Sequence, residues 1–281
     1  MSATSADCSD IRDSARYPRA DSFVRALPAE DRRRPYEISA VSTEFADADA
    51  AALYDVLNEW GRSDDFYLGL VMGAATVLDV GCGTGMLLHR ARATGHRGRL
   101  VGLDPDVAML AVARTRSDVE WVTATAAQAV WDREFEVAVM ASHAFQVFVT
   151  DEDIRASLAA IRSALIDGGR FAFETRNPAL RAWEDWNPTN AVEVVDPAGR
   201  ALRVAHEVES VDGDVVTFTE SVWVGGEPAR VDKASLRFLA PPTLDAFLAE
   251  AGFAIEARYG GWGREPFDDH RPEIITVARR R

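Results

Sequence analysis

Three glycines spaced by single residues follow an apolar stretch that carries one acid, in the run Val77–Gly85 (VLDVGCGTG). Glycine adopts positive φ angles and has no Cβ, so a ligand can lie directly against the main chain of such a turn. The turn follows a predicted strand at residues 77–80 and precedes a predicted helix at about 84–94. Ligands of open α/β sheets bind at the carboxyl ends of strands. The run therefore predicts a ligand-binding turn.

The glycine spacing separates classes of ligand. A dinucleotide fingerprint reads G-x-G-x-x-G and places a pyrophosphate at a helix N-terminus. Here the third glycine comes one residue early, and Met86 stands where the fingerprint has glycine. This spacing disfavours an NAD-dependent dehydrogenase. A glycine-rich turn of some other α/β protein is the plainer alternative.

A second acid ends the next predicted strand, residues 99–103. Asp104 follows Gly85 by 19 residues. Its carboxylate can accept hydrogen bonds from both hydroxyls of a ribose. The alternative role is an N-cap for a helix that starts near Pro105. We favour ribose binding, because the glycine turn and this acid point to the same ligand.

An acid followed by G-x-G-x-G, with a second acid after the next strand, resembles the class I S-adenosylmethionine-dependent methyltransferases. The resemblance covers roughly residues 50–280. It implies a Rossmann-like, doubly wound, mostly parallel seven-stranded sheet, and a turn that wraps the methionine part of S-adenosyl-L-methionine, released as S-adenosyl-L-homocysteine. The residues that it assigns to the cofactor are Asp79, Gly81, Cys82, Gly83, Thr84, Gly85, Asp104, Pro105, Met109, Thr125, Ala126 and Ala141.

One of these positions departs from the family pattern. Thr125 stands where the family has an acid that meets the adenine amino group. A threonine hydroxyl accepts from that group more weakly than a carboxylate does, and Gln128 is a possible substitute. Met109 is placed either against the adenine or in ordinary helix packing.

The elements that position these residues alternate along the chain. A helical stretch is expected at about 47–72, with a second helix opening at 64–68 (DDFYL), whose acids suit the first turn of a helix. After it, short apolar runs are separated by helices, which predicts a parallel sheet. The further strands are expected at 119–123, 135–141 and 171–175, and the further helices at 106–115 and 154–165. The second of these helices is expected to close at 167–169 (DGG), where glycine suits the end of a helix.

The pattern changes near residue 191. Alternating segments with a turn at Asp212-Gly213 predict an antiparallel insertion after the fifth strand. A last helix at 243–251 and strands at 253–259 and 274–278 complete the sheet. We expect four parts: an N-terminal arm, partly flexible (1–45), a cofactor-binding core (46–190), an antiparallel cap over the substrate (191–239) and the C-terminal part of the core (240–281). The arm has room for a short helix and is a candidate cover for the mouth of the active site.

Length, net charge and cysteine content limit the classes of partner that we expect for this chain. The chain has 281 residues and a formal net charge of -14, which disfavours nucleic acid because phosphate backbones are repelled. Cys8 and Cys82 are its two cysteines, so we expect neither a disulfide nor a zinc site. No apolar run of about 18 residues or secretory signal is evident. The expectation is a cytoplasmic monomer or homodimer without a metal, acting on a small molecule.

Methyl transfer from a sulfonium is an in-line displacement, in which catalysis consists mainly of positioning. A base is needed only where the acceptor loses a proton. His143 is the histidine nearest the ligand-facing edge of the sheet, and it serves as that base, orients the substrate or fills the loop. The candidate substrate-binding residues are Tyr54, His143, Arg176, Trp183 and Trp262. Aromatic walls with a few charges are typical of small-molecule sites, although each tryptophan alone is also ordinary packing.

The sequence thus predicts a methyltransferase that acts on nitrogen or oxygen of a small organic acceptor, in secondary metabolism. One alternative keeps the fold and cofactor for a rearrangement or cyclisation. Another is a catalytically silent binding subunit, which Thr125 favours and the intact Asp79, Asp104 and glycine turn oppose.

Overall fold

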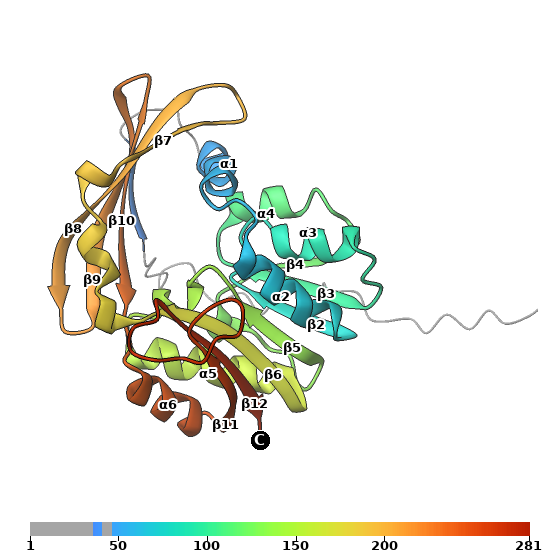
Figure 1. Ribbon diagram of the computed structural model, residues 1–281. Helices are drawn as coiled ribbons and strands as arrows, with labels where there is room; N and C mark the ends of the chain where they lie inside the picture. The colour runs from blue at the N-terminus through green and yellow to red at the C-terminus, as the bar shows by residue number, and fades with distance from the viewer. Residues whose placement is uncertain (1–35, 41–46) are drawn as a thin grey trace, which may run out of the picture. The chain divides into compact units, whose positions relative to one another are not determined.

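Five adjacent parallel strands form most of a seven-stranded sheet in the computed structural model (Figure 1), which describes residues 36–40 and 47–281. Its strand order is β11-β12-β6-β5-β2-β3-β4, and β12 runs antiparallel to both of its neighbours. The bounds are β2 Thr76–Val80, β3 Arg99–Asp104, β4 Glu120–Thr123, β5 Phe135–Met140, β6 Leu165–Arg176, β11 Phe253–Tyr259 and β12 Glu273–Arg280. This confirms the predicted fold class.

The strand order reverses at β2. The chain runs from β2 to β3 and β4 on one side, and then returns to place β5 on the other side of β2. Ligands bind beyond the carboxyl ends of the strands at such a reversal point. The glycine turn after β2 and the loop after β5 are therefore brought to the same edge of the sheet.

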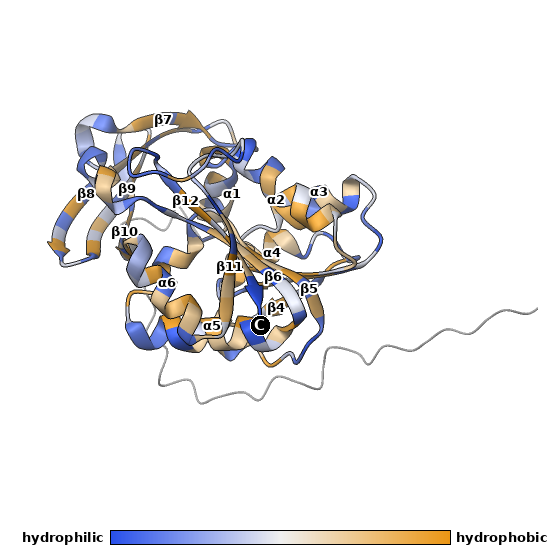
Figure 2. Cartoon of the chain, turned by 60° about the horizontal axis from the view of Figure 1, so that its bottom comes forward, coloured by the Kyte–Doolittle hydropathy of each residue, from blue (hydrophilic) through white to orange (hydrophobic). Residues whose placement is uncertain are grey.

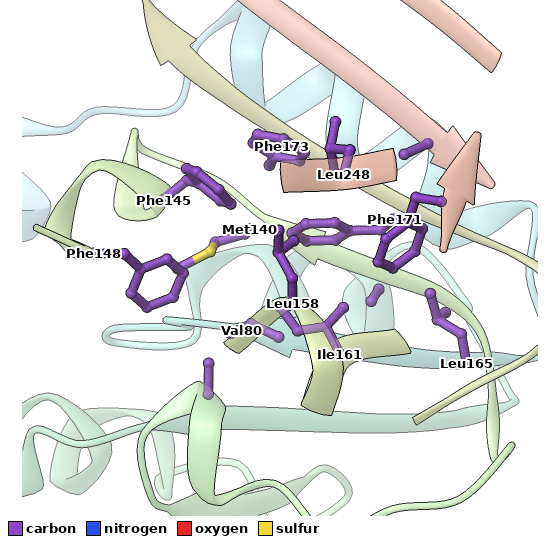
Figure 3. Close-up of a cluster of buried hydrophobic side chains, with 14 of the residues drawn as sticks. Val80, Met140, Phe145, Phe148, Leu158, Ile161, Leu165, Phe171, Phe173 and Leu248 are labelled. Atoms are coloured by element: carbon purple, nitrogen blue, oxygen red, sulfur yellow. The ribbon is translucent and has the colours of Figure 1, made fainter. Parts of the chain in front are cut away.

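Helices cover both faces of this sheet. They are α2 Arg62–Met72, α3 Met86–Ala93, α4 Val107–Ala113, α5 Asp151–Ala164 and α6 Pro241–Glu250. Successive strand side chains point to opposite faces, so Leu78 packs in a cluster with α5 and α6, and Val77 in a cluster with α2 and α3. Figure 3 shows part of the first cluster, in which Phe173 stacks on Phe145 at 4.4 Å and on Phe171 at 4.7 Å between ring centres. Figure 2 shows the hydrophobic colouring of the central strands.

The boundary between α5 and β6 differs from the prediction. The helix begins at Asp151 rather than at 154, because the Thr150 side chain caps it by accepting from Asp153 N at 3.0 Å. The helix ends at Ala164, and residues 167–169, expected as its closing turn, belong to β6. The helical stretch at 47–72 is two helices, as predicted, α1 Asp47–Leu57 and α2, and the second begins at Arg62 rather than at 64.

A second, antiparallel sheet has the order β1-β10-β9-β8-β7. Its strands are β1 Tyr36–Ala40, β7 Val192–Val195, β8 Ala201–Asp212, β9 Val215–Val224 and β10 Glu227–Arg237. Gly213, with a φ of +60°, closes the predicted turn between β8 and β9. Strand β1 was not predicted and comes from the segment expected as the N-terminal arm. The rest of that arm, with its expected short helix and its expected role as a cover, lies outside the described residues.

Helix α1 packs against the second sheet, as Figure 1 shows. Leu53 of α1 lies in a buried cluster with Leu202, Val204 and Val222 of β8 and β9. Short 3-10 helices occupy the connections at Ala126–Gln128, Ala144–Val147, Pro178–Leu180, Ala182–Asp185 and Pro188–Asn190. In the described part of the chain, no helix has the length and apolar character to span a membrane.

Candidate functional site

The glycine turn is fastened to the end of β3. Gly81 N and Cys82 N both donate to Leu103 O, at 2.7 and 3.1 Å. Gly81, Gly83 and Gly85 all have positive φ angles, at +72°, +54° and +78°. L-residues with a side chain rarely adopt this region, so the backbone path itself requires glycine at these positions.

Two of the glycines differ in what surrounds them. A Cβ on Gly85 would lie 2.4 Å from the ring of Trp121, so this glycine serves the packing of the turn against β4. A Cβ on Gly83 would meet only the Tyr54 ring, at 3.9 Å, among the described residues. The main chain at Gly83 is therefore the part of the turn that a ligand can approach, beneath Tyr54.

Asp104 ends β3 and faces this turn. It is 8% exposed; its Oδ2 accepts from Gly83 N and its Oδ1 from Asp106 N, both at 2.8 Å. The N-cap of α4 is Asp106, whose Oδ1 accepts from Ala108 N at 2.7 Å, so the alternative role considered for Asp104 belongs to its neighbour. Burial raises the pKa of Asp104, and the two backbone amides oppose that shift. Each carboxylate oxygen keeps a lone pair with which to accept from a ribose hydroxyl.

Asp79 lies within β2 and is 2% exposed. No hydrogen bond to its carboxylate occurs among residues 47–281. Burial, and then the charge of Asp104, raises the pKa of Asp79 to about 7. A buried acid with a raised pKa favours a positively charged ligand, because a cation stabilises the carboxylate form. S-adenosylmethionine carries such a charge, so the residues present fit the cofactor that the resemblance implies.

Helix α1 contributes two side chains to the turn. Thr84 Oγ1 donates to Asp55 Oδ1 at 2.6 Å. Burial raises the pKa of Tyr54, the Ser142 side chain opposes the shift, and the charge of Asp104 adds to it. Tyr54 thus lies within reach of both the glycine turn and the loop after β5.

That loop carries two consecutive residues with left-handed backbone. Ser142 has a φ of +56° and His143 a φ of +58°. Side-chain-bearing residues adopt this region at an energetic cost, and such strain gathers at functional sites. The conformation is held by Glu174 at the end of β6, whose Oε1 accepts from His143 N at 2.7 Å.

Glu174 is a buried acid with two partners. It is 1% exposed, and the Tyr67 hydroxyl of α2 donates to its Oε2. Burial raises the pKa of Glu174, while the nearby His143 and the Tyr67 hydroxyl oppose that shift. Burial and the Glu174 charge also raise the pKa of Tyr67 well above its ordinary value.

The His143 imidazole is oriented by a carboxylate. Its Nε2 lies 2.8 Å from Glu273 Oε2, at the start of β12. If Nε2 carries the proton and donates to Glu273, Nδ1 is the lone-pair nitrogen. The arrangement can accept a proton at Nδ1 while the carboxylate stabilises the resulting imidazolium.

The remaining predicted cofactor residues line the same edge. Pro105 and Met109 stand before and within α4, exposed and half-buried, and Ala141 follows β5. Thr125 is exposed and Ala126 is buried at the end of β4. Gln128 Oε1 accepts from Thr125 N at 2.9 Å, so the proposed substitute for the missing acid already holds the backbone of Thr125.

The predicted substrate residues divide into two groups. Tyr54, His143 and Arg176 lie along the edge just described, where Gln146 Oε1 accepts from Arg176 Nη1 at 3.1 Å. Trp183 packs against Phe238 at 4.6 Å between ring centres. The ring centres of Trp262 and Tyr67 lie 6.0 Å apart. Trp262 therefore packs against the tyrosine whose hydroxyl donates to Glu174.

Sequence reasoning missed several residues of the site. They are Asp55, Tyr67, Ser142, Gln146, Glu174 and Glu273. Glu174 had a readable signal, an acid embedded in the apolar strand sequence 171–175 (FAFET), just as Asp79 is embedded in 77–80. Tyr67 and Glu273 are more than 90 residues from it in sequence, and only the topology brings them together. No group of three or more metal-ligating side chains gathers in the described ranges.

Comparison with known proteins agrees with this geometry. The domain family described as "Methyltransferase domain" matches residues 77–169. The 2-phytyl-1,4-naphtoquinone methyltransferase of Thermosynechococcus vestitus is 30% identical over 224 residues, which cover 74% of this chain and 89% of the relative. Among solved structures, an S-adenosylmethionine-dependent methyltransferase of Clostridium acetobutylicum aligns with a TM-score of 0.67 at 15% identity, over 82% of this chain and 97% of that one. CalS10 of Micromonospora echinaspora, an amino pentose methyltransferase involved in calicheamicin biosynthesis, aligns with a TM-score of 0.61 at 24% identity, over 82% and 97%.

Proposed function

Because the chain belongs to the class I S-adenosylmethionine-dependent methyltransferases, we propose that it methylates a nitrogen or an oxygen of a small organic acceptor. S-adenosylmethionine is its cofactor, and supplies when bound a methyl group on a positively charged sulfur. The observation that carries the proposal is the His143–Glu273 pair, held by a strained loop at the edge where the glycine turn lies. An acceptor that must lose a proton needs such a base.

The chain's own groups divide the work of holding the cofactor. Asp104 accepts from the ribose hydroxyls, the main chain at Gly83 leaves room for close approach, and Asp79 supplies negative charge near the positive end. Tyr54 covers the turn from α1. Thr125 lies at the adenine end of the cofactor site, where its hydroxyl would accept from the adenine amino group more weakly than a carboxylate does.

His143 takes the proton that the acceptor loses. Nδ1 of His143 would accept the proton that the acceptor nitrogen or oxygen loses when it takes the methyl group that the bound cofactor would supply. Glu273 orients the ring and stabilises its charged form. Collinear placement of acceptor, methyl group and sulfur makes up the rest of the rate enhancement.

The part of the second sheet formed by residues 191–239 is the proposed cap over the acceptor, and residues 46–190 with 240–281 form the cofactor core. An aromatic group supports this role, because Trp186 packs on Phe218 of β9 at 4.8 Å between ring centres. We place the acceptor in secondary metabolism on the likeness of fold to CalS10, whose substrate is an amino pentose.

The test is a methylation assay with S-adenosylmethionine and a panel of amino sugars and phenols, each with and without a carboxylate or phosphate group, scored by a mass gain of one methyl group. His143→Ala is expected to lower kcat by about 10²–10⁴-fold, the range of general-base catalysis, with unchanged affinity for S-adenosylhomocysteine. His270→Ala, at an exposed position, is the matched control. A full rate in His143→Ala removes the base, and no methylated product with any acceptor contradicts the choice of acceptor class.

A further inference from the structure

Arg176, the last residue of β6, has a guanidinium that is only partly satisfied. Nη1 donates to Gln146 Oε1 at 3.1 Å, and the guanidinium carbon lies 5.5 Å from the ring centre of Trp186. Gln146 is fully buried and fixed at its other end, where Nε2 donates to Arg237 O at 3.1 Å. The guanidinium is therefore held in place by one hydrogen bond and one aromatic face.

Arg176 has no ion-pair partner within 4 Å among residues 47–281, and its Nε and Nη2 make no hydrogen bond there. Burial lowers the pKa of Arg176, and the charges of Glu273 and Glu174 oppose the shift without contacting the group. A partly buried cation without a partner is costly unless a counter-charge completes it.

Two other poorly exposed arginines of the described residues have carboxylate partners. Arg230 pairs with Asp232 at 2.6 Å and with Asp47 at 2.9 Å. Arg237 likewise pairs with Asp151 at the start of α5 and with Asp214 in the turn between β8 and β9. Arg162 and Arg203, which are half-buried and also have no carboxylate partner among the described residues, donate to the backbone carbonyls of Arg281 and Pro188, whereas the Arg176 guanidinium has only the Gln146 amide.

The position of Arg176 connects it to the reacting edge. Glu273 stands opposite Arg176 in the register of β12 and β6, and the same carboxylate contacts His143. On the other side, Trp186 leads into the second sheet and packs on Phe218. Arg176 thus lies where a molecule that places one group at His143 would have another group within reach of a cation.

We propose that Arg176 binds an anionic group, a carboxylate or a phosphate, of the methyl acceptor, and so selects anionic over neutral acceptors. Gln146 occupies Nη1 and leaves Nε and Nη2, the parallel pair of donors that matches two oxygens of such a group. Trp186 holds the plane of the guanidinium. This inference rests on the proposed function, because it assigns a property to the acceptor of that reaction.

Binding of simple probes tests the inference without turnover. The full-length protein, saturated with S-adenosylhomocysteine, is titrated by calorimetry with benzoate, phenyl phosphate and the neutral benzamide. Benzoate or phenyl phosphate is expected to bind, and the tighter of the two identifies the anion as carboxylate or phosphate. Benzamide, which has the shape of benzoate without its charge, is expected to bind at least about 30-fold more weakly, the size of losing a desolvated charge pair.

The decisive variant is Arg176→Gln, which is expected to weaken binding of the preferred anion by the same factor. Arg176→Lys keeps the charge but lacks the parallel pair of donors, so it is expected to retain part of the affinity. It also tests the inference if the Arg176→Gln protein does not fold. Arg203→Gln is the matched control. Arg203, on β8, also stacks on a tryptophan, with its guanidinium carbon 4.9 Å from the ring centre of Trp223. An unchanged anion affinity in both Arg176 variants, equal binding of benzamide, or no binding of either anion to the wild type overturns the inference. Failure of the proposed function is distinguishable, because it would appear as absent methyl transfer with anion binding intact.

Discussion

At the scale of single residues, Asp104 does two tasks with one carboxylate. It fixes the glycine turn through Gly83 N, and it faces the position where a ribose would lie. Asp104→Ala is expected to weaken S-adenosylhomocysteine binding by about 1–3 kcal/mol, the range for a lost charge-assisted hydrogen bond. Calorimetry measures the change, and Asp106→Ala, which removes only the cap of α4, serves as the control. An unchanged affinity for Asp104→Ala means that the ribose is bound elsewhere.

Residue types at fixed spacing were the most predictable part of the site. The strand–turn–helix pattern located Asp79, the glycines and Asp104, because local backbone geometry demands those residues there. What surrounds His143 was not predictable, since Glu174 and Glu273 reach it from strands 31 and 130 residues away. The positive φ angles at Ser142 and His143 also carry no sequence signal, because neither residue is glycine.

At the scale of elements, helix α1 joins the second sheet to the glycine turn. Leu53 packs into the second sheet, while Asp55 and Tyr54, on the same helix, contact the turn. A displacement of the second sheet would therefore shift the α1 side chains that contact the glycine turn, where the cofactor binds. The helix was predicted from its apolar spacing, but its packing against the second sheet was not, because spacing shows an apolar face without showing what covers it.

Leu53→Ala tests this connection. Because Leu53 is 3% exposed, its truncation is expected to lower the free energy of unfolding by about 2–5 kcal/mol, and to weaken S-adenosylhomocysteine binding through the displaced Asp55 and Tyr54. Urea unfolding and calorimetry measure the two effects. Leu180→Ala, at a residue 45% exposed, is the control and is expected to change neither. A destabilised Leu53→Ala protein with full cofactor affinity would show that α1 does not couple the two.

Two stretches of the chain differ from the prediction for different reasons. Strand β1 is extended because β10 pairs with it along its length, whereas its own residues give a weak local signal. Residues 167–169 have no strand partner among the described strands, and Gly168 keeps the positive φ of a turn, at +76°. They fall within β6 because Leu165 pairs with Phe135 before them, and pairing with β5 and β12 resumes at Arg170 after them. Tertiary pairing therefore sets the strand conformation of β1, and in β6 it surrounds a turn that the sequence located.

At the scale of the whole molecule, three buried acids at one edge of the central sheet link stability to pH. Asp79, Asp104 and Glu174 all have raised pKa values, with burial as the largest cause. An acid whose pKa is higher in the folded state holds a proton that the unfolded chain has already released. Between the unfolded pKa of 3.8 and the folded value of about 7, Asp79 therefore makes the cofactor-free protein less stable as pH rises, by up to about 1.4 kcal/mol per unit.

Cofactor binding should reverse part of this effect. A positively charged cofactor favours the carboxylate form of Asp79, so binding at pH 6 is expected to release a fraction of a proton that the free protein holds. Calorimetry in two buffers of different ionisation enthalpy measures that release, and Asp79→Asn is expected to reduce it and to flatten the decline of stability between pH 4 and about 7. Asp104 and Glu174 keep their own contributions, so the slope is reduced rather than abolished. Equal proton release by the wild type and Asp79→Asn would mean that the charge of the cofactor is balanced by another group.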